Sequence, residues 1–211
     1  DIYNELAKEF EWSPQDRDLA EREELTLETE SLRPIPEVRA RINRLRTKTK
    51  TSIAFVSDMY LPTDFIRERL EEHGFFVSGD SLYVSSEHGC SKAKEGRLFE
   101  VMLSRESISS ESVLHVGDDE NGDVSMANAR GLLAEPFIGG HLSVREKALA
   151  DEGSIGPRLL RSKLAGASRL ARLDCPCPKD IKQQRLWNMV CESVAPAFFG
   201  FVSDVLERAK E

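Results

Sequence analysis

The most informative stretch of the chain covers residues 113–123 and reads Val113-Leu114-His115-Val116-Gly117-Asp118-Asp119-Glu120-Asn121-Gly122-Asp123. Its first half is a short apolar run, which is typical of a strand buried on both faces of a parallel sheet. The acids follow directly, and the carboxyl ends of parallel strands are where open α/β sheets bind ligands. Clustered carboxylates repel one another, so a hard cation such as Mg²⁺ would stabilise them. The stretch predicts a magnesium site; the plainer interpretation is that Asp123 caps a helix and the other acids are solvated.

Strand and helix patterns alternate on both sides of this stretch. The predicted strands are residues 53–57, 81–85, 113–117 and 132–138. The predicted helices are residues 64–73, 96–104 and 123–131. Thr63 can cap the first of these helices, and Pro136, which has no N–H to donate, suits an edge strand. The alternation predicts an α/β fold with a parallel sheet and right-handed crossovers.

Helical patterns flank this α/β region on both sides. Residues 2–46 are charged and helical in period, and helices return after Gly139-Gly140. The last stretch, residues 195–210, is too apolar to stand alone in water and should pack against something. We therefore expect a helical cap segment over residues 1–49, an α/β core over residues 50–140 and a C-terminal helical region over residues 141–211.

Composition limits the classes of partner. The chain has 211 residues and a net charge of −8, which argues against nucleic acid because such binders need cationic surface. We find no apolar run of the roughly 18 residues that a spanning helix needs, so no membrane span is expected. The four cysteines lack zinc-ligand spacing, which indicates reduced thiols in a cytoplasmic protein. The chain opens with Asp1 inside a charged helical stretch, so we expect it to be part of a longer polypeptide.

Two further features lie at the ends of other predicted strands. Ser57 ends the strand at residues 53–57, where a hydroxyl and nearby backbone N–H groups could hold a phosphate oxygen. Taken singly, a serine after a strand is usually an ordinary loop residue. Lys92 and Lys94 follow the strand at residues 81–85 and could supply a counter-charge, although lysines are abundant on any protein surface.

The order of these features resembles the haloacid dehalogenase (HAD) superfamily of phosphohydrolases. A strand ending in Ser, a strand followed by Lys and a strand followed by Gly-Asp and a second Asp match its second, third and fourth motifs over about residues 50–139. The resemblance implies a Rossmann-like parallel sheet with a helical cap. Three segments are similar to the HAD-like proteins associated with bacterial glycosyltransferases, namely residues 55–62, 115–119 and 166–172.

The resemblance also implies roles for individual residues in binding phosphate. Ser57, Asp58 and Lys92 would form the phosphate-binding set on a small phosphorylated substrate. Lys94 is a rival to Lys92, because the spacing from either lysine to the next helix is one residue off the family pattern.

The same resemblance implies the metal ligands and the reaction. Asp118 and Asp123 would hold Mg²⁺, with Asp119 a possible further ligand, and the catalytic set would be Ser57, Lys92 and Asp118. The implied reaction is phosphate ester hydrolysis, in which an aspartate attacks in line and the resulting aspartyl-phosphate is hydrolysed.

The attacking aspartate has no clear counterpart. Nothing before Lys50 resembles the first HAD motif, an apolar strand followed by Asp-x-Asp-x-Thr. One alternative is that residues 58–63 are a degraded first motif with Asp58 as the nucleophile. Another is a non-catalytic module that keeps a phosphate or metal pocket and binds a partner such as a glycosyltransferase domain. A third is a receiver-like phosphoacceptor domain, whose acids would instead be expected on the first strand.

Overall fold

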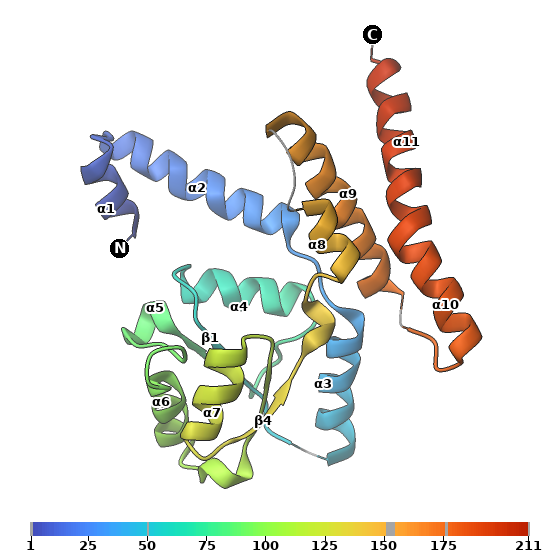
Figure 1. Cartoon of the computed structure of the whole chain (residues 1–211). Coiled ribbons are helices and arrows are strands. Elements are labelled where there is room, and N and C mark those ends of the chain that lie inside the picture. The colour runs from blue at the N-terminus through green and yellow to red at the C-terminus, as the bar shows by residue number, and fades with distance from the viewer. Residues whose placement is uncertain (1, 50, 151–154, 176, 211) are drawn as a thin grey trace. The chain divides into compact units, whose positions relative to one another are not determined.

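The computed structural model describes residues 2–49, 51–150, 155–175 and 177–210 (Figure 1). The protein is a mixed α/β protein that is mostly helical and contains two small parallel sheets. It divides into two compact units. The first unit comprises Asp1–Pro34 and Val38–Phe137, and the second comprises Ile35–Glu37 and Ile138–Glu211. The helices at the N-terminus are thus grouped with the α/β region.

The first unit contains all the strands found in the described residues. Its elements are α1 (Ile2–Glu9), α2 (Pro14–Ser31), α3 (Pro36–Thr49), β1 (Ala54–Ser57), α4 (Thr63–Glu72), β2 (Ser81–Val84), α5 (Ser85–His88), α6 (Arg97–Glu106), η1 (Ser110–Ser112), β3 (Leu114–Gly117), η2 (Glu120–Ser125), α7 (Met126–Ala129) and β4 (Leu133–Pro136). Each of the four predicted strands is confirmed within a few residues of its expected ends.

The strands form two separate pairs. β1 pairs in parallel with β2, with Phe55 opposite Leu82, and β3 pairs in parallel with β4, with His115 opposite Ala134. No strand pairing joins β1 to β3 in the part of the chain that the structure describes. The prediction of parallel strands is confirmed, but the prediction of one continuous sheet is not.

Both pairs pack on one hydrophobic cluster. Its buried members are Tyr83, Leu98, Phe99, Met102, Ala127 and Leu132. Val56 of β1 and Ala134 of β4 pack against it, so the two sheets share a core. The next residues along β1 and β2 point the other way, into a second cluster of Phe76, Leu82 and Val84 with Phe55 and, from α4, Ile66 and Leu70. This alternation places α6 on one face of the β1–β2 sheet and α4 on the other.

Two helix starts differ from the sequence predictions. α4 begins at Thr63, with Pro62 at the N-cap position and no side-chain cap bond, so Thr63 is not the cap. The predicted helix at residues 123–131 is instead the π-helical turn η2 followed by α7, and Asp119 caps it. Asp123 therefore lies inside the turn, where its carboxylate is available for contacts with other loops.

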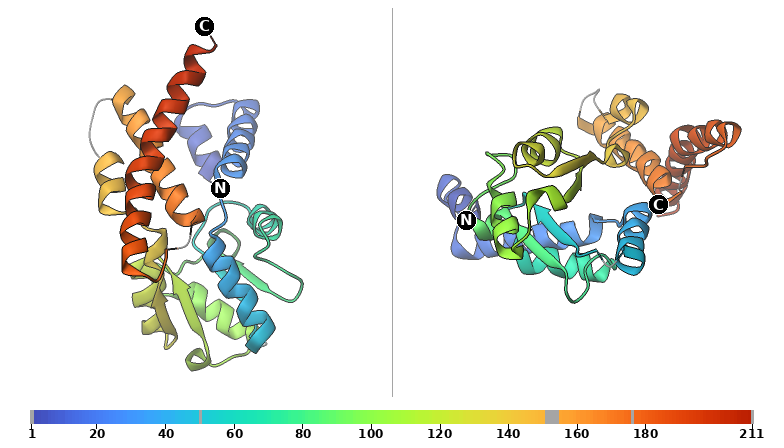
Figure 2. Two further views of the ribbon diagram at one scale, coloured as in Figure 1. Left: turned by 90° about the vertical axis from the view of Figure 1, so that its right-hand side faces the viewer. Right: turned by 90° about the horizontal axis from the view of Figure 1, so that it is seen from below.

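The second unit is helical throughout its described residues. Its elements are η3 (Ile138–Gly140), α8 (Val144–Ala150), α9 (Ile155–Asp174), α10 (Ile181–Met189), η4 (Val190–Val194) and α11 (Ala195–Arg208). Figure 2 shows α11 running beside α9, and the two helices are in contact.

A buried carboxylate organises the second unit. Glu146 is completely buried and accepts hydrogen bonds from the Ser143 backbone N–H at 2.7 Å, the Ser168 hydroxyl at 3.1 Å and the Arg172 guanidinium at 3.0 Å. Arg172 also donates to the backbone carbonyl of Gly139 at 2.8 Å. The segment at residues 166–172, which carried part of the family resemblance, thus supplies the polar core of this unit.

Candidate functional site

Three loops of the first unit meet at the carboxyl ends of its strands. They are the loop after β1, the segment that leads into α6 and the loop after β3. Asp58, directly after β1, accepts hydrogen bonds from the backbone N–H of Lys92 at 2.8 Å and of Ala93 at 3.0 Å. Asn121, in the loop after β3, donates from its side-chain amide to the Ala93 carbonyl at 3.4 Å. The segment around Lys92 is therefore held from both sides.

A buried ion pair links two of these loops. The Lys92 ammonium lies 2.5 Å from Oδ1 of Asp123, and the side chains are only 11% and 6% exposed. The same Oδ1 lies 2.9 Å from Nε2 of His115, a residue of β3 whose ring packs edge-on against Phe99. Oδ2 accepts the backbone N–H of Asp119 at 3.0 Å. Both oxygens of Asp123 are therefore engaged, as a buried carboxylate requires.

These contacts keep Asp123 ionised. Burial by itself raises the pKa of a carboxyl group. The hydrogen bonds from His115 and Lys92 outweigh this effect, and together with the Asp119 N–H they hold the pKa of Asp123 well below its usual range. The loop after β3 thus presents a fixed negative charge to the ammonium of Lys92.

Gly117 makes this arrangement sterically possible. A Cβ atom at this position would lie 2.3 Å from Cγ of Asp123, far inside van der Waals contact. Only glycine lets the carboxylate of Asp123 fold back against the end of β3. The glycine of the Gly-Asp pair is therefore explained by packing against the second aspartate of the motif.

Asp119 has a structural role in the turn. Its Oδ1 accepts the backbone N–H groups of Asn121 at 2.8 Å and Gly122 at 3.0 Å, which caps η2. This is the capping contact that the sequence analysis assigned to Asp123. One carboxylate oxygen of Asp119 is therefore used within the turn itself.

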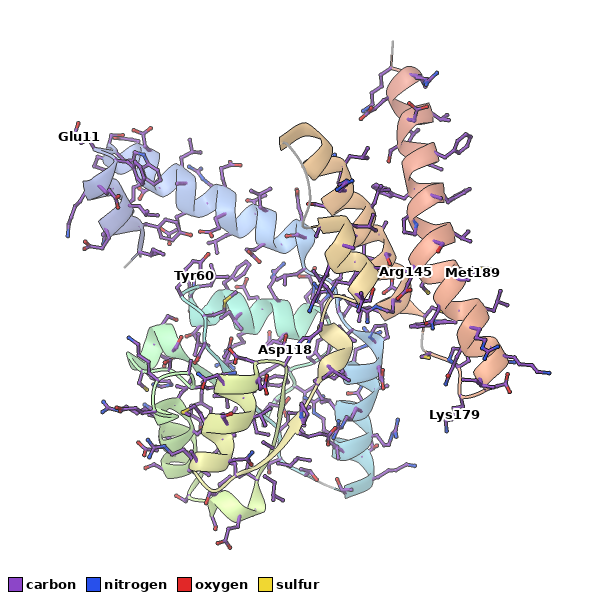
Figure 3. The ribbon with its side chains drawn as sticks, in the orientation of Figure 1. Glu11, Tyr60, Asp118, Arg145, Lys179 and Met189 are labelled. Atoms are coloured by element: carbon purple, nitrogen blue, oxygen red, sulfur yellow. The ribbon has the colours of Figure 1, made fainter. Side chains whose placement is uncertain are left out.

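The remaining predicted residues follow the ends of these strands and differ in exposure. Ser57 is partly buried at the end of β1, and Asp118 is exposed at the end of β3. Lys94 is exposed, and the structure places Lys92 rather than Lys94 against Asp123. In Figure 3, Asp118 lies at the same end of the strands as Tyr60, which follows β1.

Four residues make contacts in this unit that were not predicted, namely His115, Tyr60, Glu24 and Tyr3. His115 was treated only as a strand residue, although a histidine inside an apolar strand, two residues before Gly-Asp, is a usable signal. Tyr60 donates a hydrogen bond to Glu24 of α2 at 2.5 Å, and Tyr3 of α1 donates to the same carboxylate. These two hydrogen bonds connect α1 and α2 with the loop after β1. No local sequence pattern predicts them.

The donor set allows a magnesium ion with few protein ligands. Within residues 2–49, 51–150, 155–175 and 177–210, no three His, Cys, Asp or Glu side chains come together as a metal-binding group. Mg²⁺ commonly uses one or two carboxylates and completes its shell with waters and phosphate oxygens. Asp118, which is exposed at the end of β3, is of the residue type that such a site uses.

Comparisons with known proteins add no relatives. No family model matches the sequence, and no curated protein matches it either. The interpretation of the site therefore rests on its own geometry and on the order of its motifs.

Proposed function

We propose that the chain carries part of the active site of a Mg²⁺-dependent phosphohydrolase of HAD type, which acts on a small phosphorylated metabolite such as a sugar phosphate. The observation that supports this most directly is the convergence of three loops around the buried Lys92–Asp123 pair. Ser57 and Asp58, Lys92, and Asp118 with Asp123 come from the ends of β1, the segment before α6 and the end of β3. That is the order and placement that the HAD motifs require.

The separate strand pairs support a Rossmann-like sheet with one more strand. Isolated two-stranded parallel sheets are rarely stable, because parallel sheets need cover on both faces and several strands. β1 and β3 each have one hydrogen-bonded neighbour, and Leu114 and Val116 of β3 are exposed. We place the missing aspartate on a further strand that pairs between β1 and β3. Its carboxylate would then reach the ammonium of Lys92.

Lys92 would fix the negative charge of the substrate. Its ammonium is buried, so its interaction with a phosphoryl oxygen would be weakly screened by solvent. Asp123 holds this ammonium in place, and Asp58 holds the backbone on which it sits. The Ser57 hydroxyl at the end of β1 would donate to a second phosphoryl oxygen.

Asp118, with Asp123 acting through water, would hold the magnesium ion. When bound, Mg²⁺ would neutralise phosphoryl oxygens and so favour attack on phosphorus. His115 and Lys92 both bind Oδ1 of Asp123, so they fix the orientation of this carboxylate.

The test is hydrolysis of p-nitrophenyl phosphate in the presence of Mg²⁺ by the protein in its full natural length. Lys92→Met and Asp118→Asn should each lower kcat/KM by on the order of 100-fold or more, since each removes charge that stabilises the transition state. The matched variant Lys94→Met should leave kcat/KM close to that of the natural protein. Equal activity in all four proteins would overturn the assignment.

A second candidate is a non-catalytic module that binds phosphate or metal and a partner such as a glycosyltransferase domain. Asp58 favours it, because its carboxylate already takes the two backbone N–H groups of Lys92 and Ala93 that could otherwise hold a phosphate. This candidate predicts binding of inorganic phosphate or Mg²⁺ without any turnover in the same assay.

A further inference from the structure

The C-terminal helix of the second unit exposes an unusual amount of apolar surface. Residues Ile181–Arg208 form 28 continuous helical residues across α10, η4 and α11, with an 18-residue stretch of mean hydropathy 1.5 that is only 11% buried. Residues 195–210 were expected to pack against something, and no apolar run long enough for a membrane span was expected; the structure contains, among its described residues, one helix that meets that length and hydropathy. The largest exposed side chains are Phe198 at 66% and Phe201 at 65%.

These side chains lie on one side of the helix. Val194, Phe198, Phe201, Val202 and Val205 recur at intervals of three and four residues, which aligns them along a single stripe. We call these five residues the apolar face.

The other side of the helix is covered by protein. Pro196 is buried, and a Cβ atom on Gly200 would lie 3.5 Å from Leu164 of α9. The helix is therefore amphipathic in its contacts, with one side packed on its own unit and the apolar face left open.

The acids near the apolar face are neutralised. Glu192 lies 3.5 Å from the guanidinium of Arg145, and its side chain is mostly buried. Asp204 pairs with Arg208 at 3.0 Å. Neither acid opposes the approach of an anionic surface as a lone charge would.

Basic residues gather at the start of the helix. Lys179, Lys182 and Arg185 are exposed there, and the one acid among them, Asp180, uses its carboxylate to cap α10. Residues 138–211 carry 12 Lys and Arg against nine Asp and Glu, although the net charge of the whole chain is −8. The positive charge is thus concentrated in the unit that carries the apolar face.

We propose that the apolar face docks on the surface of a membrane that contains anionic lipids. An apolar face on a helix that also carries exposed basic groups is the pattern of helices that lie in the lipid interface. By length and composition alone this helix could also cross a membrane. The basic groups at its start and its single open side favour a position on the bilayer surface. Its packing on α9 also keeps one side attached to a charged soluble unit.

Flotation of the full chain with lipid vesicles tests this proposal. We expect binding to vesicles of phosphatidylcholine mixed with phosphatidylglycerol, and much weaker binding to phosphatidylcholine alone. Phe198→Ser with Phe201→Ser should weaken binding by on the order of 100-fold, since each removes a large apolar group from the interface. Phe10→Ser is the matched control, because Phe10 is 59% exposed in the other unit and should not matter.

A charge variant separates lipid binding from folding defects. Lys182→Glu with Arg185→Glu changes only exposed side chains, and it should reduce binding to anionic vesicles while the circular dichroism spectrum stays the same. Two results would overturn the proposal. One is the absence of vesicle binding by the natural chain. The other is a dimer in light scattering that the two Phe variants dissociate, since a second copy would then be the occupant.

Discussion

At the scale of single residues, the buried pair of Lys92 and Asp123 joins the loop after β3 to the segment before α6. Lys92→Met would leave the Asp123 carboxylate buried with only His115 and one backbone N–H as partners. Removing one partner of a buried ion pair leaves the other charge buried and uncompensated. We therefore expect the free energy of unfolding to fall by about 3 kcal/mol. Urea denaturation measures this change. Lys94→Met, at an exposed position, should change the same quantity by less than about 0.5 kcal/mol.

The low pKa of Asp123 links stability to pH. The ordinary pKa of this carboxyl group is 3.8, and folding lowers it. The ionised group therefore stabilises the folded state at pH values above about 4. This stabilisation is lost progressively as pH falls below about 4, towards the pKa of the folded state. Urea midpoints measured between about pH 6 and pH 3 should therefore drop more steeply for the natural protein than for Asp123→Asn. If the urea midpoints of the two proteins change equally with pH, the ionised, hydrogen-bonded carboxylate of Asp123 described above would be contradicted.

The position of the candidate residues, as distinct from their roles, was predictable where it follows the order of the strands along the chain. The pattern of Ser57, Lys92 and Asp118 at strand ends pointed to one edge before any geometry was known. Asp119 caps the turn after β3 in place of Asp123, because a π-helical turn, and not a regular α-helix, follows this strand. A single extra residue in a turn redirects each side chain, and sequence patterns do not resolve such a shift.

At the scale of secondary-structure elements, the end of β3 depends on a glycine. Gly117→Ala would force a Cβ atom against the Asp123 carboxylate, so we expect a loss of about 2–3 kcal/mol in the free energy of unfolding. Gly166→Ala in α9 meets no atom within 4 Å and should stabilise its helix by about 0.5–1 kcal/mol. Chemical denaturation should show a lower free energy of unfolding for Gly117→Ala and a higher one for Gly166→Ala. A free energy of unfolding that does not fall in Gly117→Ala would contradict the close packing at the end of β3.

The polar core of the second unit gives another element-scale prediction. Burial raises the pKa of Glu146, but the hydrogen bonds from Arg172 and the Ser143 N–H outweigh it and lower the pKa overall. Glu146→Gln removes the charge that pairs with Arg172 and should reduce the free energy of unfolding by about 3 kcal/mol. Thermal melting measures this change. A melting temperature equal to that of the natural protein would show that the hydrogen bonds of Glu146 contribute little to stability.

Strands and helices were predictable from the sequence, but their pairing was only partly so. Short apolar runs at β1 and β3 identify strands because burial is a local requirement. Pairing depends on which edges meet in space, and β1 and β3 proved to have one hydrogen-bonded neighbour each. The hydrogen bond between Tyr60 and Glu24 was not predicted for the same reason, because these residues are 36 positions apart in the chain.

At the scale of the whole molecule, the two units suit different tasks. The first unit carries the buried Lys92–Asp123 pair, and most of the acidic residues of the chain lie outside residues 138–211. The second unit carries the apolar face and a positive balance of charge. We therefore expect Phe198→Ser with Phe201→Ser to leave the proposed phosphate hydrolysis unchanged while it weakens vesicle binding by on the order of 100-fold.

The most direct test of the central claim is to map phosphate binding by amide NMR. Inorganic phosphate with Mg²⁺ is titrated into the isotopically labelled chain, and the shifts of backbone amides are followed. Convergence of three loops on one anion predicts that the largest changes fall together on Asp58, Lys92, Ala93 and Asp118. Changes confined to one of these loops, or spread over unrelated surfaces, would contradict it.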